Sequence, residues 1–159
     1  MEKRQKRGER ELSILLESLA GNSDRQLVKQ RLAASFEDLR ADAGQKKDEV
    51  SRIVAARLLT SFWIRLDDQV SLAFDNRNYA IAALQLEAMA LVRPDNPQVF
   101  YHLARANSLL GRKKEALEAL NKAVDKGYPD AGTLEKNHEF DALRNSAEFS
   151  KIIGELKKR

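Results

Sequence analysis

The chain has no cysteine, only three prolines and only seven glycines among its 159 residues. The lack of cysteine excludes a disulfide scaffold, a thiolate zinc site and a cysteine nucleophile. No apolar run reaches the roughly 18 residues that a membrane-spanning helix needs. The charged start has no apolar stretch behind it, so it does not resemble a signal peptide. We therefore expect a cytoplasmic protein without a membrane span. A piece of a longer exported protein would show the same features.

The net charge of +4 is concentrated at the two ends of the sequence. Residues 1–10 carry five basic and two acidic groups, and residues 157–159 are all basic. The rest of the chain therefore sums to −2, and its sequence shows no basic face. This distribution favours solvated tails over a nucleic-acid surface. Weak nucleic-acid binding through the basic ends stays as an alternative.

The apolar residues recur with helical spacing, and strong helix formers fill the positions between them. No segment has the strict alternation of a strand, so the sequence predicts an all-α protein. The stretch 48–75 fits one long helix or two in tandem. The expected helices are 2–19, about 25–41, 48–75, about 79–92, 97–110 and 113–126, then a short helix at "HEFDAL" and a final one at "AEFSKIIGELKKR".

The sequence contains no linear motif of an active site, a metal site or a cofactor site. The segment after His138, "HEFDA", lacks the second histidine of a zinc-peptidase motif. His102, the other histidine, is expected to be partly exposed on a helix. The glycines stand apart, which excludes a glycine-rich phosphate loop, and Asp67 and Asp68 would point about 100° apart on a helix. We therefore expect a protein that is not an enzyme and that holds no cofactor or metal.

Two parts of the chain are related by a shift of 34 residues. This shift places Ala82 on Ala116, Leu86 on Leu120 and Met89 on Ala123. Within 97–130 the pattern consists of Phe100, Leu103, Ala104, Gly111, Ala116, Leu120 and Ala123. This pattern resembles the tetratricopeptide repeat, a helix–turn–helix unit with small residues at fixed points. The chain departs from it at Asn107, at Pro129, which comes one residue late, and at Gln69 and Val70 in the unit 63–96.

The resemblance implies an α-solenoid of about two helical hairpins within 61–130. Ala104 and Ala116 would lie where the two helices of a hairpin cross, and a larger side chain would push the helices apart. Residues 131–159 are similar to the closing segment that often follows the last repeat in bacterial proteins of this family. We expect this segment to cap the array, and we expect 1–60 to form an N-terminal helical layer in which Trp63 is buried.

The resemblance also implies a binding groove, because the first helices of successive repeats line a concave face that receives a peptide or helix. Tyr101 and Arg105 are four residues apart on one helix face, and both residue types are favoured in binding hot spots. Alternatively, Tyr101 packs under the N-terminal helices and Arg105 is merely solvated. The groove positions correspond here to Asp67, Ser71, Phe74, Gln98, Tyr101, Arg105 and Ser108.

We therefore expect a protein-interaction module, a scaffold or adaptor that binds a peptide or helix of another protein. One alternative is a helical accessory domain or fragment of a larger bacterial protein or enzyme. Another is self-association through the amphipathic helices of 2–41.

Overall fold

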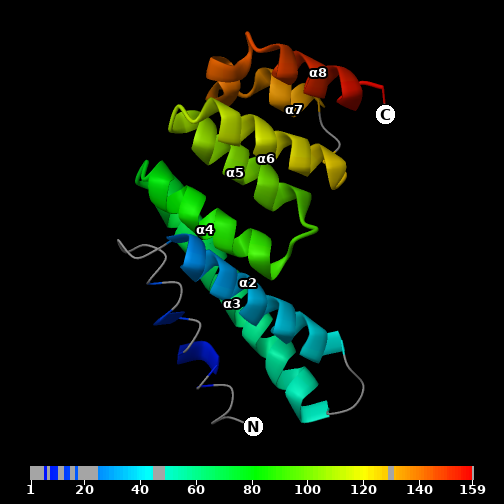
Figure 1. Ribbon diagram of the computed structural model, residues 1–159. Coiled ribbons are helices and arrows are strands. Elements are labelled where there is room, and N and C mark those ends of the chain that lie inside the picture. Colours follow the sequence, from blue (N-terminus) through cyan, green and yellow to red (C-terminus); the bar gives the residue numbers. More distant parts are fainter. Residues whose placement is uncertain are drawn as a thin grey trace. The chain divides into compact units, whose positions relative to one another are not determined.

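A computed structural model of the chain describes residues 6, 8–10, 13, 14, 17, 25–44, 49–128 and 131–158. Every regular element within these residues is helical, so the prediction of an all-α protein is confirmed. The elements are α2 (Arg25–Gly44), α3 (Glu49–Asp75), α4 (Tyr79–Val92), α5 (Pro97–Leu109), α6 (Lys113–Asp125), α7 (Ala131–Lys136), the 3₁₀ helix η1 (His138–Leu143) and α8 (Ala147–Leu156), as Figure 1 shows.

Most of the predicted first helix, 2–19, lies outside the described residues, as does the predicted break at 21–24. The positions of 2–19 that are described are helical. The helix α2 continues to Gly44, three residues beyond its expected end at 41, and the rest of the expected break, 45–48, is not described. None of the helices in the described part of the chain is long and apolar enough to cross a membrane.

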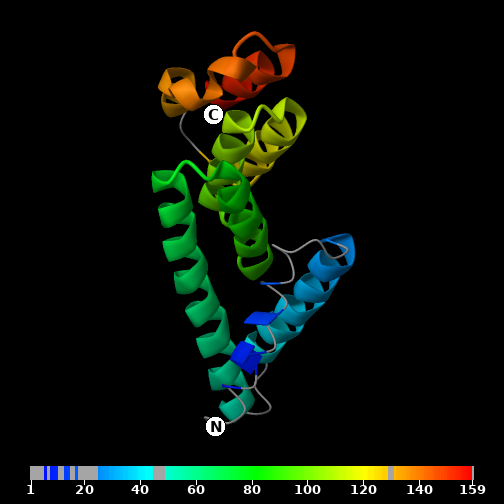
Figure 2. The same cartoon turned by 90° about the vertical axis from the view of Figure 1, so that its left-hand side faces the viewer.

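The stretch that fitted one helix or two is a single helix. The helix α3 has 27 residues and is continuous in Figure 2, which gives it a length of about 40 Å. The chain divides into two compact units, Met1–Gln69 and Val70–Arg159, and the division falls inside this helix.

The core of the first unit forms between α2 and α3. The rings of Phe36 and Phe62 meet edge to face, with their centroids 6.0 Å apart. Trp63, expected to be buried, is half-buried. The buried side chains follow the helical spacing seen in the sequence; among the described residues of this unit they are Leu32, Phe36, Val54, Ala55, Leu58, Phe62 and Leu66.

In the second unit α4, α5 and α6 pack side by side in chain order, and α8 packs on α6 and α7 (Figure 1). The helix α5 lies between α4 and α6, and η1 packs on α5. Ala104, Ala116 and Ala123 are all completely buried within the core that α5 and α6 share. Because these small side chains are completely buried in the shared core, their size sets how closely the helices approach.

The C-terminal segment belongs to the same core. The sequence did not predict α7, whereas η1 and α8 lie where short and final helices were expected. Phe140, Leu143, Phe149 and Ile152 are buried together with the α5 and α6 side chains. The end of the α5–α6 pair is therefore covered by the segment that follows it.

Candidate functional site

Tyr101 is buried beneath the C-terminal segment. Its ring stacks on Tyr128, with centroids 4.7 Å apart and planes 13° from parallel, and meets the edge of Phe140 at 5.8 Å. Its hydroxyl oxygen accepts a hydrogen bond of 3.0 Å from the side-chain amide of Asn137. Only 7% of the residue is exposed. Tyr101 therefore packs α5 against the C-terminal segment and is not accessible to a partner protein.

Arg105 forms a bidentate ion pair with Glu139 of η1. Its Nη2 donates to Oε1 of Glu139 at 2.8 Å, and its Nε donates to Oε2. Its Nη1 donates to Nδ1 of His102 at 2.8 Å. Because a guanidinium can only donate, that histidine nitrogen must be the acceptor. The guanidinium also lies over the ring of Phe74, 4.7 Å from its centroid. Arg105 is thus held on three sides.

The ion pair changes the acidity of both partners. The hydrogen bond from Arg105, joined by one from Asn137, lowers the pKa of Glu139 against the opposing effect of burial. The hydrogen bond to Glu139 raises the pKa of Arg105. Asn137 holds the glutamate from two sides, since its amide nitrogen donates to Oε2 at 3.1 Å and its Oδ1 accepts from the Glu139 backbone N–H at 2.9 Å. Glu139 is therefore ionised and fixed in place at neutral pH.

Ser108 completes the contact between α5 and η1. Its hydroxyl donates to the backbone carbonyl of Glu139, and only 5% of the residue is exposed. Three of the predicted groove positions, Tyr101, Arg105 and Ser108, thus gather around one short segment of the chain. The sequence analysis missed Glu139. A signal existed, because Glu139 stands 34 residues after Arg105, which is the period of the repeat.

The other predicted groove positions lie apart from this contact. Phe74 is half-buried at the end of α3, where its ring packs against Tyr79 at 5.9 Å as well as against Arg105. Ser71 and Gln98 are exposed. Asp67 is exposed and belongs to the first unit.

Three elements, α3, α5 and η1, thus contribute one residue each to a row within the second unit. Phe74 of α3, Arg105 of α5 and Glu139 of η1 form this aromatic–arginine–glutamate row. The side chains of Arg105 and Glu139 keep 24% and 25% of their surface exposed. Three of the five N–H groups of Arg105 are used by Glu139 and His102. The other two have no partner among the described residues, so the row has two further donors on a side chain that is partly exposed.

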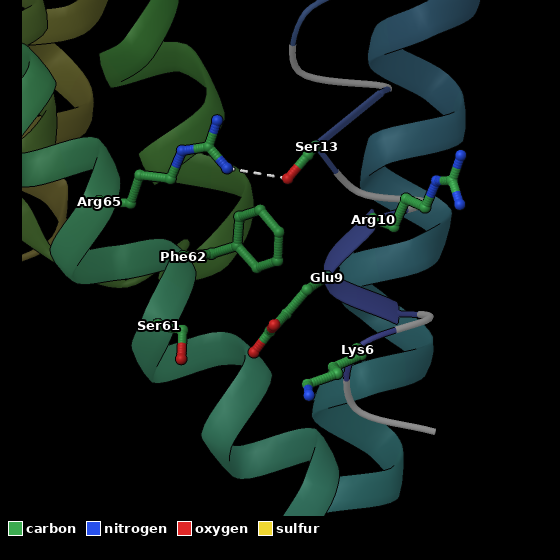
Figure 3. A pocket seen from close by; sticks show the side chains of 7 residues that line it. All are labelled: Lys6, Glu9, Arg10, Ser13, Ser61, Phe62 and Arg65. Atoms are coloured by element: carbon green, nitrogen blue, oxygen red, sulfur yellow. Dashed lines mark hydrogen bonds between the residues drawn. The ribbon is translucent and has the colours of Figure 1, made fainter. Parts of the chain in front are cut away.

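A hollow of about 490 Å³ lies in the first unit (Figure 3). Nη1 of Arg65 donates to the hydroxyl of Ser13 at 2.8 Å and so joins α3 to the N-terminal segment. The sequence analysis did not predict this hollow, because Ser13 and Arg65 on its two sides are 52 positions apart. The residues that line it are Lys6, Glu9, Arg10, Ser13, Ser61, Phe62 and Arg65.

Within the described residues, no group of three or more histidine or carboxylate side chains is placed to hold a metal ion. No protein-family model matches the chain, and comparison with curated proteins and with solved structures found no significant similarity.

Proposed function

We propose that the chain is a non-enzymatic protein-interaction module. In this proposal, two hairpins of the tetratricopeptide type form a short solenoid, residues 131–159 cap it, and a segment of a partner protein binds along the aromatic–arginine–glutamate row. The repeat spacing and the complete burial of Ala104, Ala116 and Ala123 support the architecture.

The observation that carries the binding proposal is the state of Arg105. A free arginine side chain loses roughly 2 kcal/mol of rotamer entropy when a partner immobilises it. Here Glu139, His102 and Phe74 have already fixed the side chain, while two of its N–H groups are left for a partner. Preorganisation of this kind raises affinity because the ordering cost falls on folding instead of binding.

The charge of the row indicates the chemistry of the partner. Glu139 neutralises Arg105, so a second carboxylate would gain little from the arginine and would be repelled by the glutamate. A neutral acceptor suits the two donors better. The backbone carbonyls of an extended peptide or the terminal carbonyls of a helix are acceptors of this kind. Ser71 and Gln98 lie on the same helix faces as Phe74 and Arg105, at helical spacing, and are exposed polar groups that a backbone can meet.

The test uses residues that are exposed, because replacing Tyr101 or Arg105 would also disturb the contact between α5 and η1. A Ser71→Arg, Gln98→Arg variant places two bulky side chains beside the row. A matched control, Asn121→Arg, Asn145→Arg, adds the same charge at two other exposed positions of the second unit. Both variants and the unaltered chain are used for affinity capture, and the captured protein is then titrated against each by calorimetry.

The proposal expects a partner whose affinity falls by at least about tenfold in the first variant, roughly 1.4 kcal/mol, and is unchanged in the control. Equal weakening by both variants would show that added charge alone matters. Unchanged binding by both would place the interaction elsewhere on the molecule. Either result overturns the proposed site.

A further inference from the structure

The hollow of the first unit brings basic and hydroxyl groups together from two distant segments. The N-terminal segment supplies Lys6, Arg10 and Ser13, and α3 supplies Ser61 and Arg65. Glu9 is the one carboxylate among the lining residues, so their formal charge sums to +2. The volume of about 490 Å³ lies within the range of roughly 300–1,000 Å³ that is typical of small-molecule sites.

At one end of the hollow, the guanidinium of Arg65 lies beside the hydroxyl of Ser13. Figure 3 shows the Arg65 side chain reaching across from α3 to the serine hydroxyl. Because that hydroxyl accepts from Arg65, its own proton is available to another acceptor. Four of the five N–H groups of Arg65 have no partner within the described part of the chain. A ligand oxygen at this end can therefore receive bonds from both residues.

The remaining charges decide where an anion would lie. In Figure 3, Lys6 and Glu9 point toward α3, whereas Arg10 is directed away from it. Glu9 would repel an anion, so the favourable position is beside Arg65 and Ser13. The ring of Phe62 lies beside the hydrogen bond between Arg65 and Ser13 (Figure 3) and borders the hollow with only a small part of its surface, since 3% of the residue is exposed.

We propose that this hollow binds a small organic phosphate, with its phosphate group on Arg65 and Ser13 and its organic part in the rest of the hollow. Arginine suits phosphate because its planar fork can donate two parallel charge-assisted hydrogen bonds. A phosphate dianion also matches the charge of the lining residues, and the volume leaves room for an organic part. This site is in the other unit from the proposed protein-binding row, so each can fail without the other.

The experiment titrates phenyl phosphate into the full chain at low ionic strength, followed by calorimetry or by NMR chemical shifts. Arg65→Gln removes the main donor, and Arg57→Gln is the matched control, an exposed arginine of the same helix that does not line the hollow. We expect Arg65→Gln to weaken binding about tenfold and Arg57→Gln to weaken it less than about twofold, because only a direct contact loses a charge-assisted hydrogen bond. A Glu9→Gln variant should bind more tightly, by about two- to fivefold, because it removes a nearby like charge.

Inorganic phosphate serves as the second probe and should bind more weakly than phenyl phosphate, since it lacks the organic part that occupies the rest of the hollow. Equal weakening by Arg65→Gln and Arg57→Gln would mean that only net charge attracts the anion, and would overturn the site. Weaker binding by Glu9→Gln would overturn the proposed position of the phosphate group beside Arg65 and Ser13. Phenyl phosphate that binds no better than inorganic phosphate would overturn the organic class of the ligand, and no measurable binding would overturn the proposal as a whole.

Discussion

The ion pair between Arg105 and Glu139 joins α5 to η1, and its removal gives the sharpest test of how the C-terminal segment is held. The change is Glu139→Gln, which keeps the shape of the side chain and one acceptor oxygen but removes the charge. Arg105 then stays fixed over Phe74 and beside His102 without its counter-charge. We expect the second unit to lose stability.

The magnitude follows from how far the pair is buried. Exposed ion pairs contribute about 0–1 kcal/mol, whereas breaking a buried pair costs about 3–5 kcal/mol. The side chains of Arg105 and Glu139 are 24% and 25% exposed, so the pair lies between these limits. The geometry is bidentate, and Asn137 donates a further hydrogen bond to the carboxylate and accepts one from the Glu139 backbone N–H. We therefore expect Glu139→Gln to lower the free energy of unfolding by about 2 kcal/mol at neutral pH.

The pH dependence has a definite sign. The folded-state pKa of Glu139 is below its ordinary value, chiefly because Arg105 donates hydrogen bonds to it. The stability that this ionised group provides is complete above the unfolded pKa of about 4.3 and is lost as the pH falls through the lowered folded pKa. The stability difference between the unaltered chain and Glu139→Gln should therefore be constant above about pH 5 and shrink on further acidification.

The chain carries separate optical reporters for its two units. Its single tryptophan, Trp63, is in the first unit, and its three tyrosines, Tyr79, Tyr101 and Tyr128, are in the second. Urea unfolding followed by tyrosine near-UV circular dichroism should show the loss of stability. The stacked pair of Tyr101 and Tyr128 should also give part of this signal.

Glu118→Gln is the control, because its pair with Lys114 is 3.9 Å long and both side chains are largely exposed. This change should alter stability by less than about 0.5 kcal/mol. If Glu139→Gln has no larger effect than Glu118→Gln at neutral pH, the reasoning about the ion pair is refuted. A difference that persists undiminished down to pH 3 would refute the assigned pKa direction.

Three further predictions concern packing and helix ends and are checked by thermal or urea unfolding. Ala104→Leu should destabilise by about 1–3 kcal/mol, because the position has no space for three more carbons, while Ala80→Leu at an exposed site of α4 should change stability by less than about 0.5 kcal/mol. Gly111→Ala should lower the free energy of unfolding by about 1 kcal/mol, because the residue has a φ of +72°. Gly154→Ala should raise it by about 0.5–1 kcal/mol, because this glycine lies inside α8 and a Cβ added there would meet nothing. Two effects of the same sign would contradict this account. Ser146→Ala should cost about 1 kcal/mol, since the hydroxyl accepts from the Phe149 N–H at the start of α8, and a neutral result would show that the cap is dispensable.

The sequence alone predicted most of the helices and which side chains share one face of α5. Local periodicity gave α4, α5 and α6 to within one residue, because their ends carry clear signals such as the Asn78 and Asn96 caps. The helix α7 was missed because "YPDAG" reads as a turn, and its six residues are too few to show a period. The 3.6-residue spacing also placed Tyr101 and Arg105 on one face, and the resemblance to the tetratricopeptide repeat added Ser108.

What covers that face was not predictable in the same way. Local spacing predicts which side chains share a helix face. It does not predict which segment packs on that face, and here that segment is η1, about one repeat further along the chain. The hollow of the first unit has the same origin, since Ser13 and Arg65 are joined only by the folding of distant segments. Both candidate sites therefore depend on tertiary pairing, and neither has a linear motif.

The burial of the C-terminal segment also limits how a partner can bind. Phe140, Leu143, Phe149 and Ile152 are all at most 4% exposed, and burying each such side chain contributes about 1.5–3 kcal/mol. Detaching the segment would thus cost about 6–12 kcal/mol, which is comparable to the whole stability of a typical domain. A partner that displaced the segment to reach Tyr101 or Ser108 would lose this amount from its affinity. We therefore expect a partner of the proposed row to use what stays accessible with the segment in place, namely the remaining N–H groups of Arg105 together with Ser71 and Gln98.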